Sequence, residues 1–246
     1  MTARWTSRGR GDPVTLVVHG LGATEGEARL PSSGLPGTRV VITLPGHGSA
    51  PDAPPGYWNY GSIAADVLEV AREVGATRAI GTSLGAGALT RIAAEHPGRF
   101  ERLALMLPAA LDRPREAAQA EVYRRLAEAV VADDGGARLR SILAEDIPEG
   151  VDVGGYVGQR ASALSRLGDA LRELPGAVPV QDAGALAEVA AEVLVIGATD
   201  DPLHPAEVAK ATAAAFPRSR LELLPSRAPM LTHRRAVRGQ LVDFLS

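Results

Sequence analysis

Short apolar runs without polar alternation are the feature of this chain that most limits its fold. Such runs are typical of strands that are covered on both faces, as in parallel sheets. Segments with apolar residues at helical spacing separate them, and parallel strands joined by helical crossovers form an α/β fold. The expected strands are 14–18, 39–44, 79–80, 102–107, 192–196 and 221–224, and the expected helices are 62–74, 84–95, 205–216 and 234–245.

A long segment, 112–189, interrupts this alternation. It contains no convincing strand, and it is rich in Ala, Arg, Glu and Leu. Apolar residues recur there at helical spacing, as the leucines of 164–174 do, and such stripes more often pack against a core than surround a cofactor. We therefore expect a helical insertion at 112–189 in a sheet domain built from 1–111 and 190–246.

Composition excludes several classes of protein. The chain has 246 residues with 26 basic and 29 acidic side chains interspersed, so it has no basic field for nucleic acid. The absence of Cys excludes disulfides, thiolate metal sites and a cysteine nucleophile. We find no signal peptide and no apolar run near the roughly 18 residues of a membrane span. We expect a cytoplasmic protein that binds a small-molecule substrate and neither nucleic acid nor membrane; the sequence does not indicate its oligomeric state.

The segment Gly81-Thr-Ser-Leu-Gly85 is the strongest chemical signal. G-x-S-x-G between a strand and a helix is a nucleophile elbow, in which a strained turn lifts the serine hydroxyl above the sheet. The other interpretation is a glycine-rich helix start that a serine caps. An expected strand before the motif and an expected helix after it favour Ser83 as a nucleophile.

The segment His19-Gly20-Leu21-Gly22 follows the first expected strand. It resembles the H-G-x-G oxyanion turn, in which the N–H of Leu21 and that of Leu84 hold the oxyanion. A dinucleotide fingerprint fails on spacing, because Glu25 stands where G-x-G-x-x-G needs glycine. No P-loop and no cluster with metal-ligand spacing is present, so we expect no cofactor and no metal.

Four segments together resemble the α/β-hydrolase superfamily over nearly the whole chain. They are Val17–Gly22, Leu44–Ser49, Gly81–Gly85 and Val195–Asp200, which come in the order and at roughly the spacing of that superfamily. The resemblance implies a mostly parallel, doubly wound sheet with an inserted helical cap. In that superfamily the cap is often inserted at the point of the chain where the segment 112–189 lies. It also implies a catalytic triad in the order Ser, then Asp or Glu, then His.

The resemblance places the acid just after the strand at 192–196. Asp200 has the usual G-x-x-D spacing and is the expected triad acid. Asp201 is the neighbouring candidate. Either carboxylate could instead bond its own backbone in a turn.

The histidine is the residue in which the sequence departs from the family pattern. In most relatives it follows the last strand closely, but Arg227 or Pro229 stands there, depending on the alignment, and neither is a base at neutral pH. His233 follows a few residues later and is the expected base by elimination, although a surface histidine is the alternative. His204 lies close to Asp200 and is expected to order that loop, with a base as its other possible role. The remaining histidines have simpler structural explanations.

These residues predict a serine hydrolase that cleaves an ester, thioester or lactone of a small, largely apolar substrate through an acyl-enzyme. Ser83 would attack, His233 would move the proton, Asp200 would orient His233, and the Leu21 and Leu84 N–H groups would stabilise the oxyanion. The alternative is a non-hydrolytic protein of the same fold, such as a cyclase, lyase, binding protein or pseudoenzyme, because the usual histidine position holds no histidine.

Overall fold

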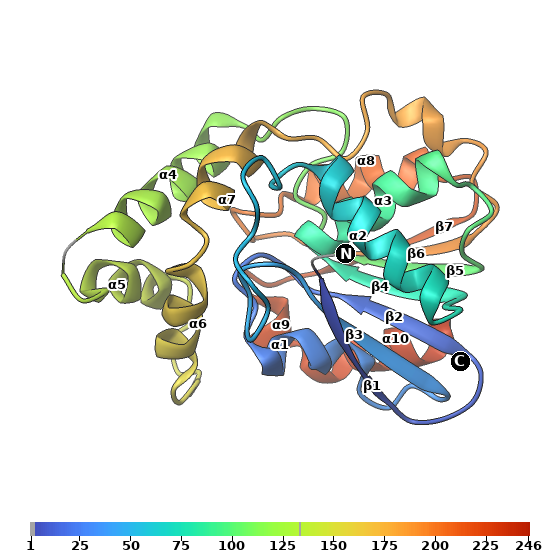
Figure 1. Ribbon diagram of the computed structural model, residues 1–246, viewed down its shortest axis with the longest axis horizontal. Coiled ribbons are helices and arrows are strands. Elements are labelled where there is room, and N and C mark those ends of the chain that lie inside the picture. The colour runs from blue at the N-terminus through green and yellow to red at the C-terminus, as the bar shows by residue number, and fades with distance from the viewer. Residues whose placement is uncertain (1–2, 133) are drawn as a thin grey trace.

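A seven-stranded, mostly parallel sheet forms the centre of the molecule (Figure 1). The computed structural model describes residues 3–132 and 134–246. The strands lie in the order β1-β3-β2-β4-β5-β6-β7, and every neighbouring pair is parallel except β1 with β3. The strands are β1 (Arg4–Arg8), β2 (Val14–Val18), β3 (Thr38–Thr43), β4 (Arg78–Thr82), β5 (Arg102–Met106), β6 (Glu192–Ala198) and β7 (Ser219–Leu224). The expected parallel α/β sheet is confirmed.

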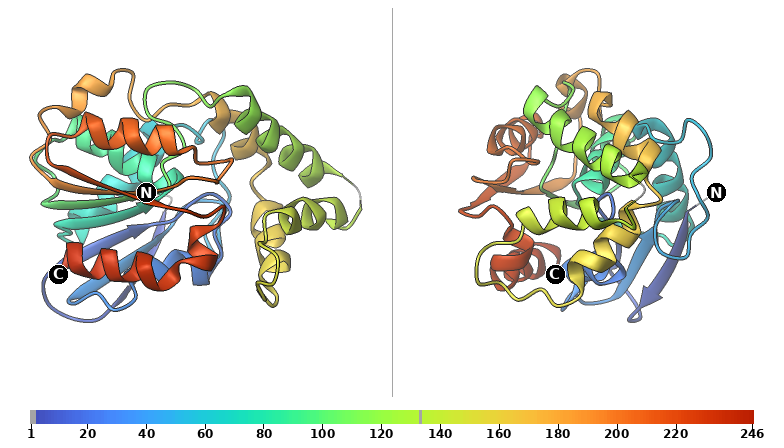
Figure 2. Two further views of the ribbon diagram at one scale, coloured as in Figure 1. Left: turned by 180° about the vertical axis from the view of Figure 1, so that it is seen from behind. Right: turned by 90° about the vertical axis from the view of Figure 1, so that its left-hand side faces the viewer.

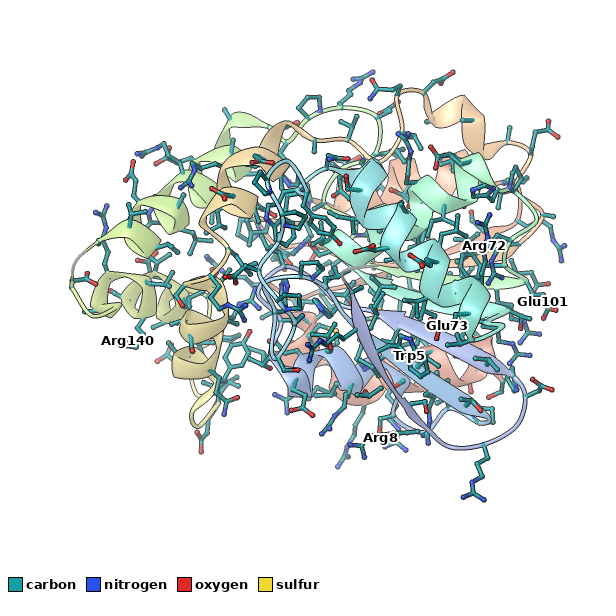
Figure 3. The ribbon with its side chains drawn as sticks, viewed as in Figure 1. Trp5, Arg8, Arg72, Glu73, Glu101 and Arg140 are labelled. Atoms are coloured by element: carbon teal, nitrogen blue, oxygen red, sulfur yellow. The ribbon has the colours of Figure 1, made fainter. Side chains whose placement is uncertain are left out.

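Strand β1 was not expected from the sequence. It is largely exposed and polar, and its only burial signal is the half-buried Trp5. It forms the antiparallel edge of the sheet through its ladder with β3, with Arg4 opposite Thr43. Figure 3 labels Trp5 and Arg8 on this edge strand. Because backbone pairing rather than an apolar pattern makes this strand, hydrophobic periodicity does not reveal it.

Helices cover both faces of the sheet, as Figure 2 shows for α8 and α10. Successive strand residues point to opposite faces: Leu16 and Val18 pack on one side and Val17 on the other. Each fully buried Leu or Ile stabilises the fold by roughly 1.5–3 kcal/mol. The first face carries α2 (Tyr60–Glu73), α3 (Leu84–Glu95) and α8 (Ala206–Ala215), and the second carries α1 (Glu25–Arg29), α9 (Pro229–Thr232) and α10 (Arg234–Leu245).

Four helices form a group at one end of the sheet (Figure 1). All of them lie between β5 and β6, and the described residues of that stretch contain no strand. They fall within the segment 112–189, for which we expected a helical cap. The four are α4 (Ala117–Val131), α5 (Ala137–Glu145), α6 (Tyr156–Leu164) and α7 (Gly168–Glu173). The described residues also form short 3-10 turns: η1 (Leu30–Ser32) lies between α1 and β3, and η2 (Leu174–Gly176) and η3 (Ala183–Leu186) follow α7. Among the described helices, none has both the length and the hydropathy needed to cross a membrane.

Candidate active site

Ser83 lies on a strained turn between β4 and α3. Its φ of 50° and ψ of −104° belong to a region that residues other than glycine rarely adopt. A Cβ on Gly85 would lie 2.1 Å from the Val18 carbonyl oxygen, and a Cβ on Gly81 would lie 2.5 Å from the backbone of Gly85. Only glycine fits at either position, so the two glycines allow the turn to pack against β2. The Ser83 N–H donates to Met106 O at 2.8 Å, which fixes the turn to β5.

His204 contacts the Ser83 hydroxyl. Its Nε2 lies 2.9 Å from Ser83 Oγ, and its Nδ1 lies 2.7 Å from Asp201 Oδ2. In the neutral tautomer with the proton on Nδ1, the ring donates to Asp201 and accepts from Ser83. A nucleophile, a base and a group that orients the base thus form one hydrogen-bonded chain.

Asp201 builds the loop as well as orienting the histidine. Its Oδ1 accepts from the N–H of Leu203 at 2.9 Å and from the N–H of His204 at 3.2 Å. Its side chain is only 10% exposed. Burial raises the pKa of this carboxyl, but the charge and hydrogen bond of His204 and the two N–H groups lower it more, so the pKa lies below its usual value. Asp201 is therefore ionised at neutral pH.

The turn after β2 lies beside the Ser83 elbow. A Cβ added to Gly20 would be 3.5 Å from Ser83 Cβ. The Gly20 carbonyl accepts from His19 Nδ1 at 2.9 Å and from the Ala23 N–H at 3.2 Å. Within the described part of the chain, the Leu21 N–H donates to no other residue, and the same holds for the Leu84 N–H at the start of α3. Both donors are available to a bound oxyanion.

Two buried histidines hold that turn in place. His19 Nε2 accepts from the Leu44 N–H at 3.2 Å, and His47 Nε2 accepts from the Gly22 N–H at 2.9 Å. Their ring centroids are 4.5 Å apart. Burial lowers the pKa of both rings, that of His47 the more strongly. Both therefore stay neutral at neutral pH, and they join the turn to the Leu44–Ser49 loop.

A cavity of about 360 Å³ opens between the strand ends and the inserted helices. Ser83, His204 and Leu21 line its floor. The insertion contributes mainly apolar side chains, namely Tyr123, Leu126, Leu143, Leu164 and Leu171 from its helices and Ile147 from the loop after α5. The opposite wall comes from α1 and α9, where Pro229 and Met230 line the cavity. Leu107 also lines the cavity. Among the described residues, Ser83 and Leu107 are the two other than glycine that have a positive φ.

A family profile identifies the protein family to which this chain belongs. The profile of the Alpha/beta hydrolase family matches residues 15–239, which include the sheet from β2 onward, the elbow and the inserted helices. The chain belongs to the alpha/beta hydrolase family. A comparison with curated protein sequences found no match.

Solved structures of alpha/beta hydrolases share the fold at low sequence identity. An esterase from Exiguobacterium antarcticum is 21% identical with a TM-score of 0.80, and the match covers 99% of this chain and 95% of that one. A hydrolase from Pseudomonas aeruginosa is 23% identical with a TM-score of 0.76, over 99% and 94% of the two chains. An enol-lactonase from Burkholderia xenovorans is 22% identical with a TM-score of 0.69, over 99% and 96%.

The structure does not bring Asp200 into this site. Its carboxylate is exposed and accepts a hydrogen bond from Thr199 Oγ1 at 3.0 Å, whereas the next residue, Asp201, turns inward to His204. The aspartate that contacts His204 is therefore the neighbour of the one that the G-x-x-D spacing predicted. Neighbouring residues in an extended turn point in different directions, and spacing to one residue does not reveal which of them faces inward.

His233 is also not brought to Ser83. It lies at the junction of α9 and α10, where its Nδ1 is 2.8 Å from Thr232 Oγ1. Among the described residues it neither lines the cavity nor hydrogen-bonds Ser83. The single turn of α9 follows β7 in the chain, and His233 ends that turn and begins α10. The pair Asp201 and His204, three residues apart beside prolines, was the sequence signal for the observed arrangement.

Proposed function

We propose that this alpha/beta hydrolase is a serine hydrolase that cleaves a carboxylic ester, thioester or lactone through an acyl-enzyme. One observation carries the proposal: Ser83 Oγ, His204 and Asp201 form a hydrogen-bonded chain with links of 2.9 and 2.7 Å at the floor of a cavity. Serine hydrolases use this order of nucleophile, base and orienting acid on several folds.

The chain of hydrogen bonds supports a two-step reaction. Ser83 Oγ attacks the substrate carbonyl while His204 Nε2 accepts its proton, and the Leu21 and Leu84 N–H groups stabilise the oxyanion. His204 then gives the proton to the leaving oxygen or sulfur, and the acyl group remains on Ser83. Water, deprotonated by His204, attacks this ester, and the proton returns to Ser83 as the acid leaves. Asp201 holds the imidazole with its proton on Nδ1 throughout.

The cavity supports a small, largely apolar acyl group. Its upper walls are mostly Leu, Ile and Tyr side chains, and its charged groups are mainly engaged with one another, as Arg227 is with Asp146 at 3.1 Å. The esterase and the enol-lactonase among the related structures support the same substrate classes. We expect activity in the cytoplasm without a metal or a nucleotide.

The alternative of a non-hydrolytic protein rested on the missing histidine after the last strand. His204, at 2.9 Å from Ser83 Oγ, is a histidine in reach of the serine and supports acyl transfer over that alternative.

The test is labelling with a fluorophosphonate, followed by intact mass and peptide mapping. We expect one adduct, on Ser83, and none on Ser83→Ala. The same variant should lower kcat for p-nitrophenyl butyrate by roughly 10³-fold or more. EDTA should leave activity unchanged. If the protein is not labelled where a control esterase reacts, the proposal is wrong.

A further inference from the structure

Arg160 on α6 reaches from the inserted helices to the turn that carries the Leu21 N–H. Its Nη1 donates to Gly22 O at 3.1 Å, and its Nη2 donates to Leu21 O at 3.3 Å. The same Nη1 lies 3.4 Å from Glu27 Oε1. One guanidinium therefore binds two successive carbonyls of the turn, which suits its planar set of donors.

The peptide between Leu21 and Gly22 is held on both sides. Its N–H donates to His47 Nε2 at 2.9 Å, and its carbonyl accepts from Arg160. Because a peptide group is planar, fixing both ends fixes its plane. The preceding peptide is held at its carbonyl by His19 and Ala23. The direction of the Leu21 N–H, which belongs to that preceding peptide, is thus set from both sides.

The guanidinium itself is held firmly. Glu27 Oε1 also accepts from Tyr156 Oη at 2.9 Å, and Glu27 Oε2 accepts from the Thr24 N–H at 2.8 Å. The Arg160 side chain is 24% exposed, so its contacts are partly shielded from water. Helix α6 also packs directly on the turn: a Cβ on Gly22 would lie 2.5 Å from Leu164 Cδ2.

We propose that Arg160 is a positioning residue for acylation, and this inference rests on the proposed acyl-enzyme mechanism. By bonding the carbonyls of Leu21 and Gly22, it keeps the Leu21 N–H directed at the position of the oxyanion. The contact of Arg160 with this turn, and not the seating of the insertion as a whole, then completes the oxyanion hole.

This role affects the transition state more than substrate binding. An oxyanion-hole donor interacts most strongly with the developing charge, and its removal costs about 10²- to 10³-fold in kcat. Loss of Arg160 misdirects the donor without removing it. We therefore expect a decrease in kcat of about 10- to 100-fold and a change in KM of less than about threefold.

Arg166 provides a matched control. It also joins the insertion to the sheet domain, through Gly48 O at 3.0 Å, Ala50 O at 2.9 Å and Asp52 at 2.6 Å, and it has no hydrogen bond to the Leu21 turn. Arg166→Ala weakens the seating of the insertion without releasing Leu21 or Gly22. It should leave kcat within about threefold of the unmodified protein.

The experiment compares Arg160→Ala, Arg160→Lys and Arg166→Ala. We measure kcat and KM for p-nitrophenyl butyrate and the second-order rate of fluorophosphonate labelling, which also needs the oxyanion hole. Arg160→Ala should lower kcat and the labelling rate in parallel, and millimolar guanidinium should restore part of both. The kcat and the labelling rate of Arg160→Lys should lie between those of Arg160→Ala and those of the unmodified protein, because an ammonium cannot bind both carbonyls as a guanidinium does. Arg166→Ala should show neither the loss nor the rescue.

Equal losses in Arg160→Ala and Arg166→Ala, or a change confined to KM, overturn the proposal. Near-ultraviolet circular dichroism and the thermal midpoint check that each variant folds. If Arg160→Ala does not fold, the same comparison of Arg160→Lys with Arg166→Lys decides. In all these outcomes the unmodified protein is labelled on Ser83, so the proposed function stands. If the unmodified protein is not labelled, both proposals fall.

Discussion

The loop after β6 and the loop after β7 leave neighbouring strands of the sheet, and they do different things. The first, 199–205, folds into a turn in which Asp201 accepts from two N–H groups and holds His204 toward Ser83. The second, 225–233, begins α9, where Ser226 Oγ accepts from the Ala228 N–H at 3.0 Å. One loop supplies both partners of the serine, and the other supplies a wall of the cavity.

The comparison shows that an acid and a base in the same turn need few contacts with the rest of the protein to be held together. Asp201 and His204 are three residues apart, so their mutual distance is set locally and does not depend on how α10 packs. Only the distance from His204 to Ser83 depends on the sheet. Among the described residues, no side chain of the loop after β7 hydrogen-bonds Ser83 or His204, and Pro229 and Met230 line the cavity there.

The largest expected effect separates the two histidines. His204→Ala should lower kcat for p-nitrophenyl butyrate by roughly 10⁴-fold or more, because it removes the proposed base. His233→Ala should change kcat by less than about twofold, because among the described residues this ring hydrogen-bonds Thr232 and neither Ser83 nor Asp201. Steady-state kinetics of both variants test this, and the reverse pattern would break the comparison between the loops.

A second, somewhat smaller effect separates the two aspartates. Asp201→Asn keeps an oxygen for the Leu203 and His204 N–H groups but presents an amide N–H to Nδ1, which favours the wrong tautomer. We expect a loss in kcat of roughly 10³- to 10⁴-fold. Asp200→Asn, at an exposed carboxylate, should lie within about twofold of the unmodified protein. Comparable losses in the two variants would contradict the assignment of Asp201.

Substitution in the second loop should change binding and not chemistry. Met230→Ala removes apolar surface from the cavity wall, and we expect KM for p-nitrophenyl hexanoate to rise about fivefold. The rate of acylation in single-turnover experiments should change far less. A large decrease in that rate would mean that the loop after β7 takes part in the reaction after all.

The smallest expected effect is on stability and depends on pH. The pKa of Asp201 is lower in the folded protein than its usual value of about 3.9. Its ionised form therefore contributes stability above about pH 4, and this is lost as the pH falls through the folded pKa. Urea unfolding between pH 7 and pH 3 should show Asp201→Asn destabilised most at the upper end, with the difference shrinking below about pH 4. A difference that is constant with pH would show that the carboxylate charge does not matter.

Local patterns in the sequence determined the parallel sheet, the helical insertion and the elbow. Apolar runs predict buried strands wherever burial on both faces forces an all-apolar segment, which holds for β2 to β6 and fails for the exposed edge strand β1. The elbow is equally local, because the turn around Ser83 leaves no room for a Cβ at Gly81 or Gly85.

Only the tertiary structure decided that His204 lies beside Ser83, that Asp201 contacts His204, and that Arg160 of the insertion reaches the Leu21–Gly22 turn. His204 lies 121 residues from Ser83 in the chain, and Arg160 lies 138 residues from Gly22. Such contacts depend on the relative placement of strands and helices, on which face of a turn a side chain takes, and on how the insertion packs. Periodicity and motif spacing describe a chain along its length, whereas these distances arise only when remote segments pack against each other.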